Sequence, residues 1–345
     1  MTSTTTRKLN KVRNSFYVYL PKQWCDKYNL NQDSEVKIKE TGEGTLTVFP
    51  PDFQHQKSSG IRFNIDKDFL LNLQNILIGA YVVGATKLEL NFSKSLDMAE
   101  RQEISQSIRR LPGFEILEEH SNSISIRDTS EKQMVVSILK RQFATTKYML
   151  SELVAGIATE DYSDAQHILM RDEDVDRHRY FVERLCHLAL RDPSYARKIG
   201  IPPSDCLHFS LAAKYVERMA DHVCGAVEHL CESTLSLESI AETAKYLLDV
   251  YNRTKSAFFA NEGAMEQVQE NGSVTYKTEE TFEALHAAEA IAEKLSKMGT
   301  EPNGLEAKLA LLLLHMERIA SYCSDVGEVA INRSIEVSIE NPQSD

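Results

Sequence analysis

The chain has 345 residues, with 39 Lys and Arg against 51 Asp and Glu, and its formal net charge is −12. A hydrophobic share of 42% and a charged share of 26% exclude wholesale disorder, and the length predicts two or three domains. The net acidity excludes a protein that coats nucleic acid or anionic lipid with its whole surface, although a local basic patch stays compatible with it.

Export and membrane insertion are not expected. The chain opens Met1-Thr2-Ser3-Thr4 without the apolar core of a signal peptide. Its longest apolar stretch, residues 70–85, contains polar residues and is shorter than the roughly 20 residues of a membrane helix. The six cysteines form no CxxC pair. We therefore expect a cytoplasmic protein with reduced thiols.

Residues 1–52 have the pattern of a small β unit. Apolar and β-branched runs predict strands at 16–20, 36–39 and 46–49, and Pro50-Pro51 ends the unit. Pro21 at a first helical position predicts a short helix over 21–28.

Residues 53–128 predict an α+β middle domain. Alternating apolar residues indicate strands, and apolar residues three or four apart indicate helices. The expected order is βαβαββ, with strands at 61–65, 86–92, 114–117 and 123–126 and helices at 69–83 and 99–111.

The remainder of the chain predicts only helices, at 131–159, 161–191, 205–232, 236–270, 279–298 and 304–335. At an offset of 100 residues, Glu217-Arg218 coincides with Glu317-Arg318, each in the third helix of a group of three. We expect two three-helix repeats, 129–233 and 234–337, and a polar tail at 338–345. The predicted fold class is therefore multidomain α+β, with a C-terminal all-α bundle.

Two pairs of carboxylates in the first repeat have the spacing of one helix face. Asp172 and Asp176 are four residues apart, as are Glu217 and Asp221 in the following long helix. Like charges at this spacing repel unless a cation lies over them, and clustered carboxylates suit Mg²⁺, Mn²⁺, Ca²⁺ or iron. The alternative is a pair of solvated acidic faces.

The second repeat departs from this pattern. Ser321 stands at the register of Asp221, four residues after Glu317, and Asp325 follows one turn later. Glu289 and Glu293 supply a pair on the preceding helix. We expect a poorer metal site there, or none.

The N-terminal unit has a basic end. Residues 1–32 contain six basic residues and one acid. Such residues beside a strand and a short helix can bind the phosphates of a DNA duplex; the alternative is an ordinary basic terminal segment. The candidate DNA-binding residues are Arg7, Lys8, Lys11, Arg13 and Lys22.

Catalytic motifs are absent from the sequence. It contains no Walker loop, no GxSxG and no HExxH. Glu283 and His286 form one ExxH, whereas carboxylate-bridged di-metal bundles use that motif twice. We expect a protein that is not an enzyme.

The helical half resembles the PhoU family of phosphate-signalling regulators. The resemblance rests on Asp172-x-x-x-Asp176, on 182–186 (VERLC), on 216–223 (VERMADHV) and on 316–322 (MERIASY). It implies two three-helix repeats that bind metal clusters. The implied ligands are Asp172, Asp176, Glu217 and Asp221, with Glu317 and Asp325 in a second cluster that Ser321 puts in doubt.

The first 50 residues resemble the AbrB/SpoVT family of swapped-hairpin DNA-binding domains. The resemblance rests on 7–9 (RKL), 15–24 (SFYVYLPKQW), 33–38 (DSEVKI) and 44–48 (GTLTV). It implies a homodimer whose basic residues face DNA. The combination with a PhoU half is similar to the archaeal-type phosphate uptake regulators.

These observations predict a phosphate-responsive, DNA-binding regulator of phosphate uptake whose bundle binds a metal ion such as Mg, Mn, Fe or Zn. The alternative is an adaptor that docks on a phosphate transporter's ATPase or on a sensor kinase, with the N-terminal unit only dimerising. The charge division fits the first prediction, because residues 1–52 sum to +2 and residues 129–345 to −13 (8 basic and 6 acidic residues, and 22 and 35).

Overall fold

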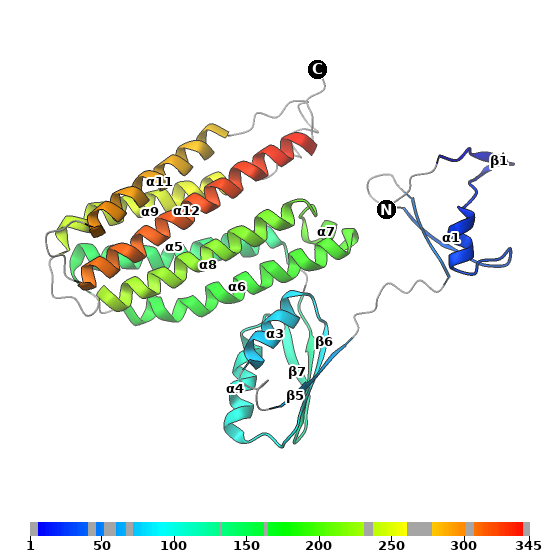
Figure 1. Ribbon diagram of the computed structural model, residues 1–345, viewed down its shortest axis with the longest axis horizontal. Helices are drawn as coiled ribbons and strands as arrows, with labels where there is room; N and C mark the ends of the chain where they lie inside the picture. The colour runs from blue at the N-terminus through cyan, green and yellow to red at the C-terminus, as the bar shows by residue number, and fades with distance from the viewer. Residues whose placement is uncertain are drawn as a thin grey trace. The chain divides into compact units, whose positions relative to one another are not determined.

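In the computed structural model of the chain, residues 6–40, 46–51, 60–66, 72–131, 133–161, 165–230, 237–260, 278–300 and 307–340 are described. The chain divides into two compact units, Met1–Lys57 and Ser58–Asp345. Figure 1 shows strands and the short helix α1 in the first unit, and a sheet with helices followed by a helical bundle in the second. The predicted multidomain α+β fold class is confirmed.

The first unit consists of two hairpins and a short helix. Strand β1 (Asn10–Val12) pairs antiparallel with β2 (Ser15–Tyr17), and β3 (Lys37–Glu40) pairs with β4 (Leu46–Phe49). The short helix predicted over 21–28 is α1 (Lys22–Lys27), with Pro21 as its N-cap and not at its first helical position.

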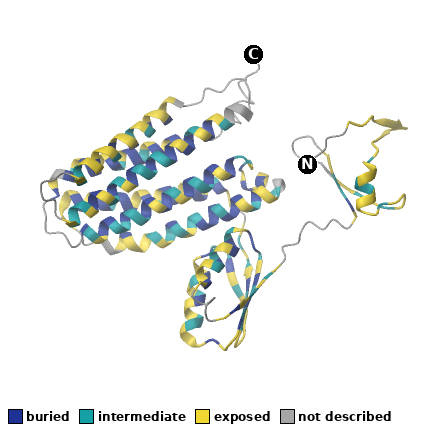
Figure 2. Cartoon of the chain, in the orientation of Figure 1, coloured by how far each residue is buried: buried dark blue, intermediate teal, exposed yellow. Residues whose placement is uncertain are grey.

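This first unit leaves large apolar side chains in solvent. Figure 2 shows mostly exposed residues along β1, β2 and α1. Side chains that are more than half exposed include Leu9, Val12, Phe16, Tyr17, Val18, Tyr19, Ile38 and Leu46. A chain segment this short buries little core by itself.

The second unit begins with the predicted βαβαββ segment. Its elements are β5 (Ile61–Ile65), α3 (Leu73–Val82), β6 (Lys87–Phe92), α4 (Met98–Arg109), β7 (Phe114–Glu119) and β8 (Ser123–Asp128). The strands form one sheet in the order β5-β6-β8-β7, with β5 parallel to β6 and the other neighbours antiparallel. A capping box of Asp97 and Glu100 begins α4.

One face of this sheet is covered and the other is polar. Leu88 and Leu90 of β6 and Ile124 and Ile126 of β8 are fully buried, and they alternate with half-buried polar residues along both strands. Helices α3 and α4 lie on the apolar face (Figure 1).

The bundle consists of long amphipathic helices near the predicted ranges. They are α5 (Val135–Thr159), α6 (Ala165–Arg191), α8 (Asp205–Leu230), α9 (Glu238–Phe259), α11 (Thr278–Thr300) and α12 (Ala307–Glu340). The short α7 (Pro193–Ile199) was not predicted. Asp192-Pro193 predicts only the end of the preceding helix, although proline is also common at the first position of a helix. Residues 261–270, predicted to extend the fourth helix, lie outside the described residues.

The two groups of three helices meet along α8 and α12. The Tyr215 ring stacks on Tyr322 at 6.0 Å, and His222 Nδ1 lies 2.9 Å from His315 Nδ1. Because 215 corresponds to 315 and 222 to 322 at the 100-residue offset, these two contacts are equivalent. Helices α8 and α12 therefore pack antiparallel about a pseudo-two-fold axis.

Arg184 of α6 joins the middle sheet to the bundle. Its guanidinium is fully buried, forms an ion pair with Asp128 at 2.5 Å and donates to the carbonyl oxygens of Tyr81 and Ala85. The same group lies 4.6 Å from the centre of the Tyr81 ring. A buried charge needs such a set of partners, so Arg184 fixes α6 against the sheet domain.

Among the described helices, none is long and apolar enough to cross a membrane.

Candidate functional site

The two carboxylate pairs predicted in the first repeat lie on packed helices, and the charge of Asp221 on one helix acts on Asp172 and Asp176 on the other. Asp172 and Asp176 project from α6, and Glu217 and Asp221 project from the neighbouring α8. Glu217 is buried, and the other three side chains are half-buried. We call these four residues the acidic cluster.

The ionisation of the acidic cluster is shifted by burial and by the charges of its own members. Burial raises the pKa of Asp172 to about 6, with further contributions from the charges of Asp221 and Asp176. Burial likewise raises the pKa of Glu217 to about 7, against the opposing charge of Arg179. The pKa of Asp176 is also raised, chiefly by burial. Each shift means that negative charge here is costly until a cation offsets it.

Two arginines already lie against the acidic cluster. Arg179 is 3.4 Å from Glu217 and 3.2 Å from Glu183, and its guanidinium stacks on Tyr180 at 4.5 Å. Arg218 is 2.9 Å from Asp221. These pairs neutralise part of the negative charge at the α8 side.

Two carboxylate oxygens of the acidic cluster keep no hydrogen bond. Asp172 Oδ1 and Glu217 Oε2 are buried and have no hydrogen-bond partner among the described residues. Arg218 Nε lies 3.6 Å from Glu217 Oε2, within ion-pair range but too far for a hydrogen bond. A buried oxygen without a hydrogen bond is costly, and oxygen atoms of carboxylates are the ligands that hard cations take. The donor set therefore fits a hard metal ion.

The side chains are not arranged as a finished metal centre. Within the described ranges, no three His, Cys, Asp or Glu side chains are placed so that they could hold one ion. The metal site at Asp172, Asp176, Glu217 and Asp221 stays a prediction.

Three groups near the acidic cluster are not among the residues predicted from the sequence. Arg179 follows Asp176 by three residues, about one helical turn, and this spacing is a sequence signal for it. Burial raises the pKa of Cys224 to about 12, with smaller contributions from Asp172 and Asp221. Arg110, from the end of α4, is 3.3 Å from Glu173, and only the tertiary fold brings it to α6.

The corresponding acids of the second repeat are arranged differently. The Ser321 hydroxyl donates to Glu317 at 2.9 Å, so a neutral hydrogen bond occupies the place of the second carboxylate. Asp325 has a pKa raised by burial and by the charge of Glu328. Glu293 pairs with Lys297 and Glu289 with His286, and both glutamates are more than half exposed.

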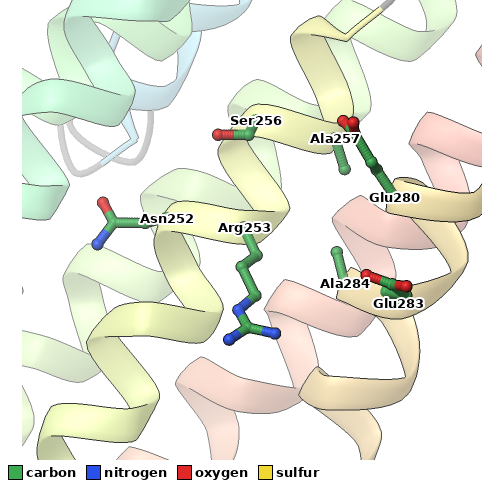
Figure 3. Close-up of a pocket in the computed structure, with 7 residues that line it drawn as sticks. All are labelled: Asn252, Arg253, Ser256, Ala257, Glu280, Glu283 and Ala284. Atoms are coloured by element: carbon green, nitrogen blue, oxygen red, sulfur yellow. The ribbon is translucent and has the colours of Figure 1, made fainter. Parts of the chain in front are cut away.

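A hollow of about 340 Å³ lies in the second repeat, between α9 and α11. Figure 3 shows the residues that line it, which are Asn252, Arg253, Ser256, Ala257, Glu280, Glu283 and Ala284. None of the predicted DNA-binding or metal-binding residues lines this hollow. Glu283 of the single ExxH does line it, whereas His286 of that motif lies 3.2 Å from Glu289.

The five candidate DNA-binding residues all belong to the first unit and are all exposed. Lys11 lies on β1, Arg13 is in the turn after it with a φ of 55°, and Lys22 begins α1. Arg7 and Lys8 precede β1. Lys11 Nζ lies 5.7 Å over the Phe16 ring, and none of the five forms an ion pair with an acid of the described chain.

Comparison with known families matches both ends of the chain. Residues 139–230 match the PhoU domain, and residues 9–53 match the family described as antidote-toxin recognition MazE, bacterial antitoxin. Searches of curated proteins and of solved structures found no match. The chain combines a PhoU domain with a MazE/AbrB-like N-terminal domain, as its sequence motifs predict.

These two domains indicate the general role of the chain. A PhoU domain indicates regulation of phosphate homeostasis, and a MazE/AbrB-like domain indicates DNA binding or antitoxin-like recognition. The PhoU match covers α5 to α8, which is the helix group that carries the acidic cluster.

Proposed function

We propose that the protein is a phosphate-responsive transcriptional regulator of phosphate uptake and not an enzyme. A dimer of the first unit binds DNA, and the PhoU-like bundle, holding a metal ion in its acidic cluster, relays phosphate status. The observation that carries the proposal is that exposed basic residues, which form no ion pair with a described acid, lie in a MazE/AbrB-like unit that is joined to a PhoU domain.

The basic residues support contact with DNA over a role limited to dimerisation. Basic residues that serve folding or assembly are expected to pair with acids, whereas Arg13 and Lys22 stay exposed without such a pair in the described chain. An unpaired cation in solvent can exchange its counterions for a DNA phosphate, and the released ions drive binding.

The apolar surface of the first unit supports a homodimer. Phe16 is 66% exposed and Tyr19 is 73% exposed, although both lie in the apolar run around β2. Covering this surface with a second copy removes it from water, and each Å² of apolar surface so covered stabilises the dimer by about 25 cal/mol.

The salt dependence of DNA binding tests this role. Replacing two phosphate-contacting residues, Arg13→Ala with Lys22→Ala, is expected to lower the slope of log affinity against log salt concentration by about 2 on a phosphate-uptake promoter fragment. The matched control is Lys27→Ala with Lys37→Ala, which removes the same charge from the same unit. Equal slopes for both double variants would show that only net charge matters and would refute the assigned contacts.

For the bundle, the residues that would hold the metal are Asp172, Asp176, Glu217 and Asp221. A bound cation would supply positive charge that stabilises four crowded carboxylates. Accepting it requires Glu217 and Asp221 to loosen their pairs with Arg179 and Arg218. A second ion between Glu317 and Asp325 is the weaker part of the proposal, because Ser321 offers no charge.

Elemental analysis of protein purified without chelator tests the metal site. The Asp176→Ala/Asp221→Ala variant is expected to lose most of its bound Mg, Mn, Fe or Zn. Its control is Glu173→Ala/Asp174→Ala, because these two acids lie between Asp172 and Asp176 in the sequence and are about half exposed. The site assignment is wrong if both variants retain the metal content of the unmodified chain.

The second candidate function is an adaptor that docks on a phosphate transporter's ATPase or a sensor kinase. It is favoured by the PhoU domain alone, and it requires the first unit only to dimerise. A chain that is dimeric in light scattering but shows no salt-dependent DNA binding would support the adaptor.

A further inference from the structure

Strand β5 is an edge strand of the sheet, and no other strand of the described chain pairs with its outer side. Ser93 N donates to Ile65 O at 3.1 Å, so the peptide groups of Ile65 point toward β6. Successive residues of a strand that is paired in parallel direct their N–H and C=O groups to opposite sides. The groups of Arg62 and Asn64 therefore point outward, away from the sheet.

The two edges of this sheet differ in how they are protected. The β7 edge carries Glu115, Glu118 and Glu119, and its register with β8 shifts between Ile116 and Glu118. Charges and bulges of this kind prevent another strand from pairing. By contrast, β5 pairs with β6 in an unbroken five-residue register and contains no proline.

The polar side chains of β5 are also directed toward the sheet. The Arg62 guanidinium donates two hydrogen bonds to Glu89 of β6, at 2.8 and 2.6 Å. The Asn64 side chain lies 3.4 Å from Asn91 of the same strand. Glu89 also pairs with Lys87 at 2.8 Å. The ion pair with Glu89 therefore holds the Arg62 guanidinium at β6, on the side away from the free edge.

We propose that this β5 edge pairs with β5 of a second copy of the chain, antiparallel and centred on Phe63, so that two four-stranded sheets become one. In that register Arg62 lies opposite Asn64 of the partner, and the outward backbone groups of both form hydrogen bonds. Ile61 lies opposite Ile65 of the partner on the helix-covered face. The segment complements itself, as a two-fold interface requires.

A second copy of the chain is the favoured partner of the β5 edge, because dimerisation of the first unit would hold two β5 strands near each other. This step rests on the proposed dimerisation of the first unit. Only residues 50–60 connect β4 to β5, a length that reaches at most roughly 40 Å even when fully extended. Two β5 strands tethered this closely have an effective concentration on the order of millimolar, which an unlinked partner strand would have to exceed.

Cysteine cross-linking of the full chain tests the pairing. A centred antiparallel pair without hydrogen bonds brings its Cα atoms to about 4.5 Å, a distance that permits a disulfide. Phe63→Cys is therefore expected to form a covalent dimer under mild oxidation, read on a non-reducing gel. Leu117→Cys, on the opposite edge, should form no more than the unmutated chain. Adding Asn64→Pro removes an outward N–H and should abolish the Phe63→Cys link.

Parallel variants and light scattering separate the possible failures. Should Phe63→Cys fail to fold, the exposed pair Arg62→Cys/Asn64→Cys provides the same link between opposed residues. A chain that is dimeric, but whose β5 cysteines link no faster than Leu117→Cys, overturns the β5 pairing and leaves the N-terminal dimer intact. That result would assign the edge to a strand of another protein or to none. A monomeric chain overturns both proposals.

Discussion

The two halves of the bundle show how far one side chain can change a shared framework. In the first repeat, Glu217 and Asp221 face Asp172 and Asp176, and burial with mutual repulsion raises the pKa values of three of the four. In the second, Ser321 replaces the second acid of α8 and donates a hydrogen bond to Glu317. The two repeats share the same helix register. The first repeat places four carboxylates near one another, whereas in the second a hydroxyl of the same helix donates a hydrogen bond to the carboxylate.

The seam between the halves shows that this difference is local. The contacts Tyr215–Tyr322 and His222–His315 are equivalent at the 100-residue offset, so the repeats pack alike where they meet. A repeat can keep its packing and lose its chemistry, because packing depends on apolar volume whereas a cation site depends on a few charged atoms.

The largest expected effect concerns the attachment of the first repeat to the sheet domain. Arg184→Ala leaves Asp128 and two carbonyl oxygens without their buried partner, and the free energy of unfolding should fall by about 3–5 kcal/mol. Arg253→Ala in the second repeat is the control, since Arg253 is half exposed and its ion pair within the described chain is with Asp249 on its own helix. It should change stability by less than about 0.5 kcal/mol. Denaturant unfolding measures both. Equal losses of stability in the two variants would contradict a special role for Arg184 in attaching the first repeat to the sheet domain.

A smaller effect is expected from the charge of Glu217. Its pKa is raised to about 7, so the folded chain binds a proton more tightly than the unfolded chain, and the stabilising contribution of that proton is present below about pH 4.5 and lost as the pH rises through 7. In the presence of chelator, Glu217→Gln should therefore stabilise the protein at pH 8, by on the order of 2–3 kcal/mol, and flatten the pH profile.

The matched control for Glu217 is its repeat equivalent. Glu317→Gln keeps an acceptor for Ser321 and should shift stability by no more than about 0.5 kcal/mol. Thermal unfolding at pH 5 and pH 8 provides the readout. Destabilisation by Glu217→Gln at pH 8 would contradict this prediction, because it would mean that the ion pairs with arginine outweigh the cost of burying the charged carboxylate.

The smallest change in free energy is expected from exchanging Asp221 and Ser321 between the two repeats, which is also the most direct test of how the repeats differ. Asp221→Ser gives the first repeat the side chain of the second, and Ser321→Asp does the converse. The first should weaken metal affinity by roughly tenfold or more, about 1.4 kcal/mol, and the second should add affinity at Glu317. Calorimetric titration with Mn²⁺ measures both. No gain from Ser321→Asp would show that the remaining acids of the second repeat lie too far apart.

Much of the fold could be predicted from the sequence, because the spacing of apolar residues indicates which face of a helix or strand is buried. The long helices and the order βαβαββ follow from apolar spacing alone, and the structure confirms them within a few residues at most ends. The short α7 was missed because Pro193 signals both a break and a helix start. The strand order β5-β6-β8-β7 could not be predicted, since spacing along one strand carries no information about its neighbour.

The candidate sites divide in the same way. Spacing four apart placed Asp172 with Asp176 and Glu217 with Asp221, because both pairs lie within single helices. Arg110, which reaches Glu173 from the end of α4, carries no sequence signal, because it lies more than 60 residues earlier in the chain.

The sequence by itself determined three features: the opposite net charges of the two ends, the repeat at an offset of 100 residues, and the spacing of the acids within each helix. Each of these depends only on the order of residues along the chain. The tertiary structure decided which helices face one another, which carboxylate oxygens are left without hydrogen bonds, and that Arg184 is buried between the bundle and the sheet. The physical reason is that pKa values and buried ion pairs depend on distances through space and on removal from water. Both are set only when segments remote in the chain pack together.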